Sequence, residues 1–361
     1  MSSKLFSPVT IGPVDLANRI VIAPMCQYSG EDGSATAWHH VHLGSLALSG
    51  AGLLMVEATA VEQIGRITRG CLGLYTDANE AALGEVVSIL RKVSDVKLGI
   101  QISHAGRKGS SHVPWNGGKA LGRGEGAWET IAPSPLPFTD GWPAPREADE
   151  ADLEQLVHAF AEATRRAVRL GFDVIEMHAA HGYLLHEFLS PLTNRRTDSF
   201  GGSIENRMRF PLRVFEAMRD ACSGRVALGA RITGSDWLAG GIDPDQAIAF
   251  ASALKQRGCT YVDVTSGGLD PAARIKAEPD YQVGFAERVR KASGIPVRAV
   301  GLITEPAQAE RIVAEGRADM VALARAILAD PRWPWRAAHM LGEKLEWPFQ
   351  YQRATPASWI G

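Results

Sequence analysis

Two histidines and a tyrosine lie close together in the segment His178-Ala-Ala-His-Gly-Tyr183. Two imidazole N–H groups can hold a carbonyl, nitro or phenolate oxygen and stabilise the negative charge that develops there during conjugate reduction. A phenol with a reference pKa of about 10 stays protonated at neutral pH, so Tyr183 can donate a proton. The hydride must come from a cofactor, because no side chain delivers one. The segment therefore predicts reduction of a polarised double bond.

The same pair of histidines has two other interpretations. Spaced three residues apart, His178 and His181 could bind zinc in a metal-dependent hydrolase. Such a site usually needs a third protein ligand, and the expected neighbours include Gln101 and Arg231 rather than carboxylates. We therefore predict no metal. Alternatively, both histidines could bond to the backbone of the fold and have no chemical role.

The elements that must position these residues alternate along the chain as short apolar runs and longer amphipathic stretches. Eight such repeats predict an α/β protein with a (β/α)8 or TIM barrel rather than an open sheet. Strands that are apolar throughout fit a sheet covered on both faces. We expect strands at Ile20–Ala23, Leu53–Ala58, Leu98–Ile102, Val174–His178, Val226–Ile232, Tyr261–Thr265, Val297–Val300 and Met320–Ala324. We expect helices near His39–Leu48, Ala78–Val93, Leu153–Leu170, Ser203–Cys222, Asp245–Arg257, Gly284–Ala292, Glu305–Ala314 and Arg325–Leu328.

Two segments depart from this rhythm. Residues 105–146 are rich in Gly, Pro and Trp, and we interpret them as a long insertion after the third strand that shapes the active-site mouth. Residues 341–361 follow the last barrel helix as a C-terminal tail. Because no repeat larger than the βα unit is present, we expect residues 1–361 to form a single domain.

Composition favours a globular protein that binds small molecules. Hydrophobic residues make up 45% and charged residues 22%, and the net charge of −2 gives no basic surface for nucleic acid or membrane. The N-terminus has no signal-peptide pattern, and no apolar run reaches the ~18 residues of a membrane helix. The four cysteines are scattered without a C-x-x-C pair. We therefore expect a reduced, cytoplasmic protein.

In a TIM barrel, functional residues gather where the strands end. At such positions Gln101 could donate and accept hydrogen bonds at a pyrimidine edge, and the alternative is a buried structural amide. Arg231 would be costly to bury unpaired. An anionic reduced flavin would compensate its charge, and so would a salt bridge with an acid such as Asp263.

The turns after the seventh and eighth strands are a common phosphate site in this fold, formed by backbone N–H groups and a helix N-terminus. Here the candidates are Gly301, Ala324 and Arg325, and the arginine could add charge-assisted hydrogen bonds. Gly301 could equally be an ordinary turn residue, so this signal is weak by itself.

Four motifs strengthen the interpretation because they occur together and in order. They are ANRIVIAPM at 17–25, QISHAGR at 101–107, HAAHGYLLHEFLSP at 178–191 and NRRTDSFGGSIENR at 194–207. The chain resembles the Old Yellow Enzyme family of FMN-dependent ene-reductases over about residues 5–353. That family adopts a TIM barrel. The resemblance also implies non-covalent FMN, NADPH or NADH as reductant, and an activated alkene as substrate.

Carried over residue by residue, the resemblance implies a role for each candidate. The flavin ring would contact Pro24, Met25, Cys26, Ala60, Gln101 and Arg231. The ribityl and phosphate groups would lie near Val300, Gly301, Ala324 and Arg325. Substrate would contact Tyr28, His178, His181, Tyr183 and Arg353. The two histidines would bind the activating oxygen while Tyr183 protonates the α-carbon. Hydride would pass from flavin N5 to the β-carbon in a ping-pong cycle with NAD(P)H.

Cys26 with Tyr28 resembles the thermophilic-like, xenobiotic-reductase branch of the family. A thiol at position 26 could tune the flavin, or it could be an inert core residue. In this branch one subunit lends a tail arginine to its neighbour. The segment Gln350-Tyr-Gln-Arg353 resembles that tail, so we expect Arg353 to be lent within a homodimer or a dimer of dimers. The alternative is a frayed, solvated terminus.

Overall fold

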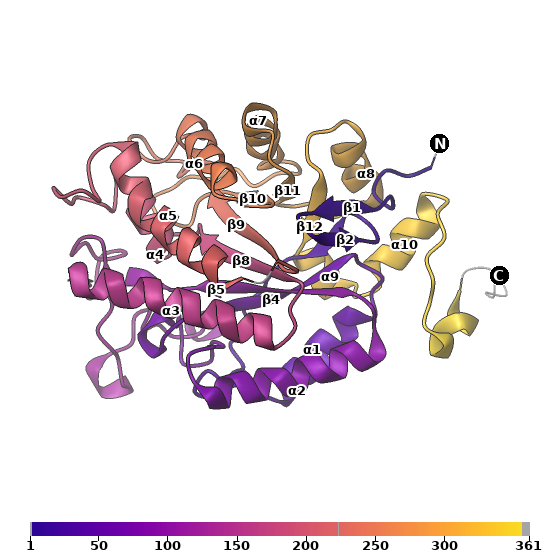
Figure 1. Ribbon diagram of the computed structural model, residues 1–361, viewed down its shortest axis with the longest axis horizontal. Helices are drawn as coiled ribbons and strands as arrows, with labels where there is room; N and C mark the ends of the chain where they lie inside the picture. The colour runs from indigo at the N-terminus through magenta and orange to yellow at the C-terminus, as the bar shows by residue number, and fades with distance from the viewer. Residues whose placement is uncertain (1, 223, 356–361) are drawn as a thin grey trace.

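The computed structural model describes residues 2–222 and 224–355, and its centre is a closed barrel of parallel strands (Figure 1). Hydrogen bonds close the barrel, because its last strand in the sequence (residues 320–323) pairs with its first (residues 20–22). The predicted (β/α)8 fold is confirmed. The barrel strands are β3 (Ile20–Ile22), β4 (Leu53–Ala60), β5 (Lys97–Ser103), β8 (Val174–Ala179), β9 (Ala227–Thr233), β10 (Val262–Thr265), β11 (Val297–Val300) and β12 (Met320–Leu323).

Helices surround the barrel and bury their apolar sides against it (Figure 1). Local signals define their starts: the Asp243 side chain accepts hydrogen bonds from the backbone N–H groups of Asp245 and Gln246, with Pro244 at the first helical position. The helices between strands are α1 (Ala37–Ala47), α2 (Asp77–Val93), α3 (Glu150–Arg169), α5 (Ile204–Ala221), α6 (Pro244–Gln256), α7 (Val283–Ser293) and α8 (Pro306–Ala314).

The last expected helix, near Arg325–Leu328, is confirmed as the five-residue helix α9 (Arg325–Ala329). A second helix that was not predicted, α10 (Trp333–Met340), begins just after Pro331. A proline disfavours helical geometry in the residue before it, here Asp330, so the chain cannot continue as one helix. A further short helix, α4 (Leu184–Leu189), was not predicted, because all six of its residues are buried and show no amphipathic period.

The remaining elements are small. Two hairpin strands, β1 (Val9–Ile11) and β2 (Val14–Leu16), pair with each other, and so do β6 (Ile131–Ala132) and β7 (Arg146–Glu147). The short 3₁₀ helices are η1 (Gln63–Gly65), η2 (Gly106–Lys108), η3 (Pro114–Asn116), η4 (Arg123–Glu125) and η5 (Phe349–Ala354).

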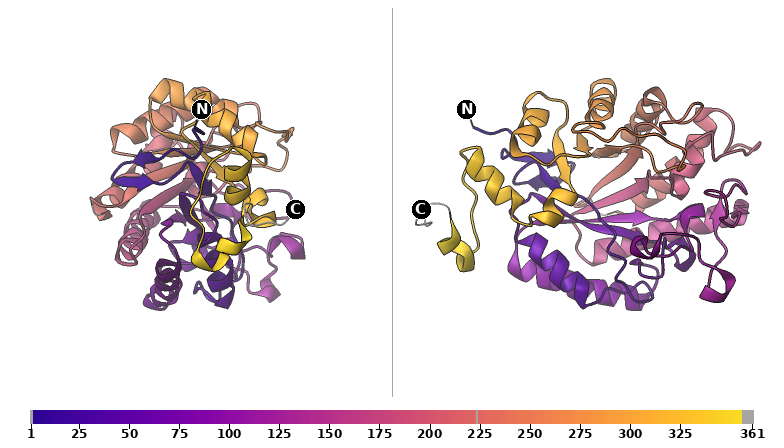
Figure 2. Two further views of the ribbon diagram at one scale, coloured as in Figure 1. Left: turned by 90° about the vertical axis from the view of Figure 1, so that its right-hand side faces the viewer. Right: turned by 180° about the vertical axis from the view of Figure 1, so that it is seen from behind.

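The predicted insertion and the C-terminal tail lie at opposite ends of the molecule. Residues 105–146 lie between β5 and α3, as expected, and therefore begin at the carboxyl end of the third barrel strand. Figures 1 and 2 place these loops far from the yellow tail, which lies beside the N-terminus. Trp347 of the tail stacks on Trp335 of α10, with ring centroids 4.0 Å apart. Residues 356–361 of the expected tail lie outside the described part of the chain.

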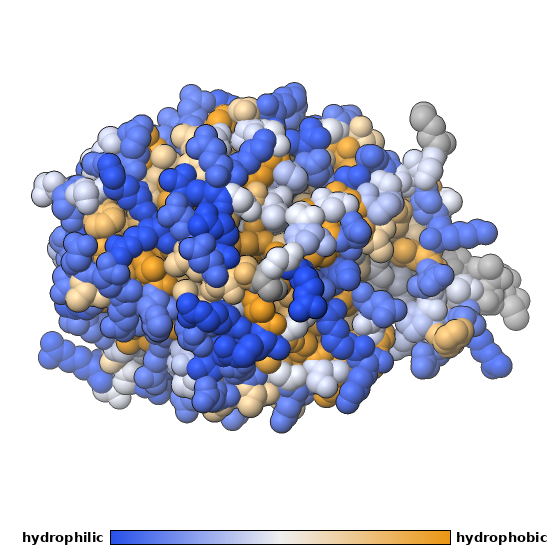
Figure 3. Space-filling view, in the orientation of Figure 1, coloured by the Kyte–Doolittle hydropathy of each residue, from blue (hydrophilic) through white to orange (hydrophobic). Residues whose placement is uncertain are grey.

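The face seen in Figure 3 is mainly hydrophilic, with apolar side chains in separate patches. Among the described residues, no helix is long and apolar enough to cross a membrane. The helices and strands share one large apolar core. The barrel interior is different, because it also contains buried acids and arginines.

Candidate functional site

The two histidines and the tyrosine form one cluster of rings at the end of β8. His178 is in the strand, whereas His181 and Tyr183 follow in the loop before α4. Ring centroids are 5.1 Å apart between His178 and His181 and 5.0 Å apart between His178 and Tyr183. The Nε2 atom of His178 lies 3.3 Å from the Nδ1 atom of His181. Two imidazole nitrogens therefore lie close enough to bind a single oxygen atom.

The loop that carries this cluster has an unusual backbone. His181 has a φ of +60° and Gly182 a φ of +72°, both in the left-handed region. A Cβ atom on Gly182 would lie 2.4 Å from the carbonyl oxygen of Gly268, so only glycine fits there. Lys108 links this loop to the segment that contains Gly268, because its Nζ donates to the carbonyl oxygens of both His181 and Gly268 at 2.8 Å.

A buried histidine–aspartate pair supports the loop from the opposite side. The Gly182 N–H donates to Nδ1 of His186 at 2.8 Å, and Nε2 of His186 lies 2.8 Å from Oδ1 of Asp236. His186 and Asp236 are both fully buried. Sequence reasoning assigned neither residue a role, although His186 lies within one of the quoted motifs. Its partner is 50 residues away and could not be identified from spacing.

Burial keeps the ring cluster uncharged at neutral pH. It lowers the pKa of His178 well below its ordinary value, and the positive charge of Arg231 lowers it further. The pKa of His181 falls well below its ordinary value for the same two reasons. Burial raises the pKa of Tyr183 well above that of a free phenol, and the neighbouring Cys26 and Tyr28 add to this effect. The cluster therefore offers neutral imidazoles and a protonated phenol.

A cavity of about 180 Å³ opens beside the cluster and gathers many of the other candidates. Gly301 in its wall has a φ of +112°, and a Cβ atom there would lie 2.3 Å from the Gln282 side chain. Arg325 is exposed at the start of α9 and has no ion pair within the described residues. The predicted residues that line this cavity are His181, Arg231, Val300, Gly301, Ala324 and Arg325.

Arg231 is buried and only partly compensated. Its Nε lies 3.1 Å from Oδ1 of Asp263, which makes an ion pair, but the atoms are not aligned for a hydrogen bond. The salt bridge that the sequence left open is therefore present, with Asp263 inside strand β10. The Arg231 guanidinium makes no hydrogen bond to another described residue, and Arg231 lines the cavity.

Gln101 lies inside the barrel, where its Nε2 donates to Oε1 of Glu176 at 2.8 Å. Pro24, Met25 and Cys26 follow β3, and Ala60 ends β4. None of these five residues lines the 180 Å³ cavity. Burial, and secondarily Glu57, raises the pKa of the Cys26 thiol well above its ordinary value, so the thiol is protonated.

The insertion contacts Tyr28, because the ring of its Trp115 lies edge to face with the ring of Tyr28, with centroids 5.9 Å apart. Arg353 is different. Arg353 is exposed and belongs to η5 in the C-terminal tail. Figure 2 shows this yellow tail at the end of the molecule opposite the loops that follow β5. Arg353 therefore does not join the ring cluster of its own chain.

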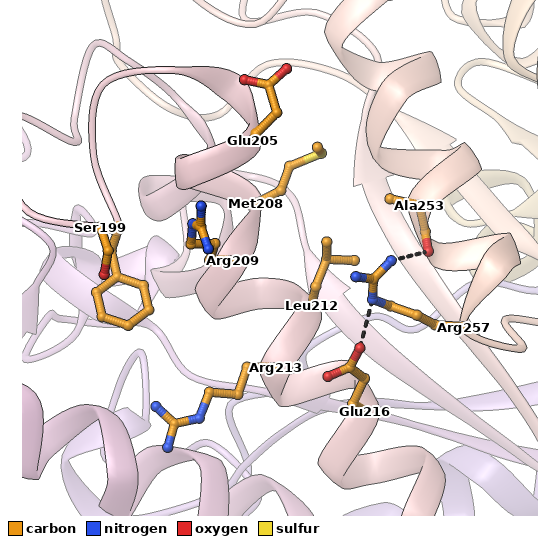
Figure 4. A pocket seen from close by; sticks show the side chains of 10 residues that line it. Ser199, Glu205, Met208, Arg209, Leu212, Arg213, Glu216, Ala253 and Arg257 are labelled. Carbon is orange, nitrogen blue, oxygen red and sulfur yellow. Dashed lines mark hydrogen bonds and ion pairs between the residues drawn. The ribbon is translucent and has the colours of Figure 1, made fainter.

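A larger hollow of about 550 Å³ lies on the outer surface between α5 and α6 (Figure 4). Arg257 there pairs with Glu216 at 2.7 Å, while Met208 and Leu212 form part of its floor. None of the predicted site residues lines it. Across residues 2–222 and 224–355, no group of three or more His, Cys, Asp or Glu side chains is arranged to hold a metal ion.

Comparisons with known proteins identify relatives along nearly the whole chain. Residues 4–344 match the family described as NADH:flavin oxidoreductase / NADH oxidase. An NADPH dehydrogenase of Geobacillus thermodenitrificans (strain NG80-2) is 45% identical over 355 residues, covering 98% of this chain and 99% of the relative.

Solved structures agree with this relationship. Morphinone reductase in complex with tetrahydroNAD superposes with a TM-score of 0.75 at 28% identity, covering 98% of this chain and 93% of that chain. A 2-naphthoyl-CoA reductase complex with 2-naphthoyl-CoA gives a TM-score of 0.84 at 26% identity and covers 94% of this chain. This chain spans 52% of that longer protein.

Proposed function

The chain belongs to the NADH:flavin oxidoreductase / NADH oxidase family, the Old Yellow Enzyme family expected from its motifs, and from this premise we propose that it reduces activated alkenes. It is an FMN-dependent oxidoreductase with NADPH as reductant. The substrates proposed are C=C bonds conjugated to a carbonyl, nitro or imide group. Reduced FMN, when bound, supplies the hydride that the β-carbon of the alkene receives.

The residues around the cavity suit FMN. The unused donors of Arg231 can bind an anionic flavin, and Arg325 offers an uncompensated positive charge to a phosphate. Only glycine fits at Gly301 in the cavity wall, because its φ is +112° and a Cβ atom would meet the Gln282 side chain at 2.3 Å. We assign Val300 and Ala324 to the same ribityl and phosphate end. The flavin ring is assigned to Pro24, Met25, Cys26, Ala60 and Gln101.

The single observation that carries the proposal is the ring cluster. His178 Nε2 and His181 Nδ1 are 3.3 Å apart, so both can bind one substrate oxygen. Both imidazoles are neutral, and a neutral N–H stabilises developing negative charge without an ionised histidine. Tyr183 contacts the ring of His178 and keeps its proton, so its Oη can hold that proton for the α-carbon. Tyr28 is assigned to the other wall of the substrate site.

We also propose a homodimer, or a dimer of dimers, in which Arg353 enters the neighbouring active site. Arg353 is exposed and distant from the ring cluster of its own chain, which supports a role in another subunit. The tail that carries it is anchored: Arg332 lies over the rings of Trp335 and Tyr351, at 4.8 and 5.4 Å from their centroids. This packing gives the tail a defined conformation.

Turnover of a substrate panel without oxygen tests the proposal. Enones, maleimides and nitroalkenes should each be reduced by NADPH with ping-pong kinetics, because reductant and alkene use one site in turn. Flavin reduction without turnover of any alkene would contradict the proposal. A colourless protein with stoichiometric zinc would instead support a metal-dependent hydrolase that uses His178 and His181.

A further inference from the structure

A continuous chain of polar contacts crosses the interior of the barrel. Gln101 is the Cα partner of Glu176 between β5 and β8, and Asp263 of β10 is the partner of both Arg231 in β9 and Arg298 in β11. Side chains of partnered residues on neighbouring strands point to the same side of a sheet. The register therefore brings these five side chains together inside the barrel, and we call this set of side chains the interior chain.

The contacts in this interior chain alternate in charge. Arg298 donates to Glu176 through one nitrogen and to Oδ2 of Asp263 through Nε at 2.5 Å. Asp263 then faces Arg231, and Glu176 accepts the amide of Gln101. Glu176, Asp263 and Arg298 are all 0% exposed. Two acids and two arginines thus make a neutral set, in which Arg231 lines the cavity and the other three side chains are shielded from water.

Glycine makes room for the interior chain. Gly229 is the Cα partner of Glu176, and a Cβ atom on Gly229 would lie 2.2 Å from the ring of Tyr261. Because that Cβ is absent, Tyr261 reaches across the barrel and donates its hydroxyl to Oε2 of Glu176 at 2.8 Å. TIM-barrel interiors are usually filled with branched apolar side chains. A buried charged set in this place therefore requires a reason.

The residues at the two ends of the interior chain indicate what the buried charges do. Gln101 and Arg231 are the two polar residues assigned to the flavin ring, and both touch a carboxylate of this set. We propose that Asp263, Glu176 and Arg298 are positioning residues that set the reduction potential of the bound flavin. They would act through the field of Arg231 and the orientation of Gln101. This inference rests on the proposed placement of the flavin beside those two residues.

Each acid has a separate effect. A two-electron reduced flavin carries more negative charge than the oxidised one, so an uncompensated Arg231 favours the reduced form. The Asp263 carboxylate beside Arg231 weakens that field and lowers the potential. Arg298 in turn holds Asp263 in place and offsets its charge. Glu176 accepts from Nε2 of Gln101, which fixes the amide so that its Oε1 is free to accept a hydrogen bond from the ligand.

The test is an anaerobic reductive titration of the FMN-loaded protein against a redox dye, for wild type, Asp263→Asn, Arg298→Met and the double variant. Asp263→Asn should raise the reduction equilibrium constant at least about tenfold, which corresponds to roughly 30 mV for two electrons. Arg298→Met should lower it by a similar factor. The double variant restores net neutrality and should return to within about threefold of wild type.

The double variant distinguishes an effect of net charge on the potential from a structural defect, because it combines both substitutions but keeps the set neutral. Asp319→Asn is a matched control: it removes an acid that pairs with Arg290 at 2.9 Å outside the interior chain, and should leave the potential unchanged. If Asp263→Asn does not fold with FMN, Glu176→Gln provides the same test, since loss of either acid must shift the potential upward. Equal potentials in all variants, or a double variant as displaced as Asp263→Asn, would overturn the inference.

Arg231→Met distinguishes this inference from the proposed function. If Arg231→Met leaves the flavin potential unchanged, the flavin does not lie beside Arg231 and the proposed placement fails with it. If Arg231→Met shifts the potential and the interior variants do not, only the positioning role is lost.

Discussion

The ring cluster at the mouth and the interior chain both contain buried ionisable groups, but those of the ring cluster are neutral and those of the interior chain are charged. At the mouth, burial lowers the pKa of both His178 and His181, and no acid compensates them, so they stay neutral. In the interior, burial alone would lower the pKa of Arg298, but the carboxylates of Glu176 and Asp263 outweigh it and raise that pKa.

The difference shows that a deeply buried group keeps its charge where an opposite charge compensates it and becomes neutral where none does. Lys108 and Glu187 fall between the two regions. Burial lowers the pKa of Lys108 to about 8 and raises that of Glu187 to about 8, with only partial compensation from neighbouring charges. Under the proposed function, the neutral donors would lie where substrate charge develops, and the paired charges would supply a fixed field.

The largest expected effect comes from breaking the interior pairing. Glu176→Leu leaves Arg298 with one acid and removes the acceptor of Tyr261 and Gln101. Removing one partner of a buried pair costs about 3–5 kcal/mol. Urea unfolding of the FMN-loaded protein measures this loss. Asp220→Asn, which breaks the exposed Arg219–Asp220 pair, should change stability by less than about 1 kcal/mol. Similar small losses in both variants would contradict the comparison.

At the mouth, the protonated phenol can be removed with little change in shape. Tyr183→Phe should slow reoxidation of reduced flavin by an enone by about a hundredfold or more, the usual range for a general acid. Flavin reduction by NADPH needs no such proton and should change far less. Stopped-flow measurement of each half-reaction separates the two. Equal slowing of both would argue against Tyr183 as the donor.

The neutrality of the histidines predicts a pH dependence of stability. In the unfolded chain both histidines take up protons below about pH 6.5, whereas in the folded protein their lowered pKa values keep them neutral. The unfolded state therefore binds more protons, and stability falls as pH falls. From pH 6.5 to 5.5 wild type should lose about 2 kcal/mol more than His178→Asn/His181→Asn. Parallel pH profiles would mean that the imidazoles are protonated in the folded state.

The smallest expected effect concerns the exposed tail. Arg353→Ala should weaken binding of the alkene about tenfold if the proposed loan of its charge to the neighbouring subunit holds, while folding and FMN content stay unchanged. Steady-state kinetics at constant protein concentration give this value, and Arg336→Ala on α10, an exposed arginine paired with Asp330, is the matched control. Unchanged kinetics in Arg353→Ala would leave the tail without a role in catalysis.

The sequence was sufficient for the features that depend on local pattern. The eight strands follow from apolar runs, and the candidate residues follow from the rule that strand ends converge at one mouth. Glu176, Asp263 and Arg298 were visible as charged residues within apolar strands. Their mutual pairing was not predictable, because it depends on the register of strands closed into a barrel. The split between α9 and α10 was predictable in principle from Pro331.

The central claim is that this FMN enzyme passes hydride to an alkene held by His178 and His181. Its most direct test is a single turnover without oxygen, in which photoreduced protein is mixed with one equivalent of 2-cyclohexenone and flavin absorbance is followed. The account predicts that the oxidised spectrum returns with one equivalent of cyclohexanone, and that His178→Ala/His181→Ala is much slower. A flavin that stays reduced until oxygen is admitted would contradict it.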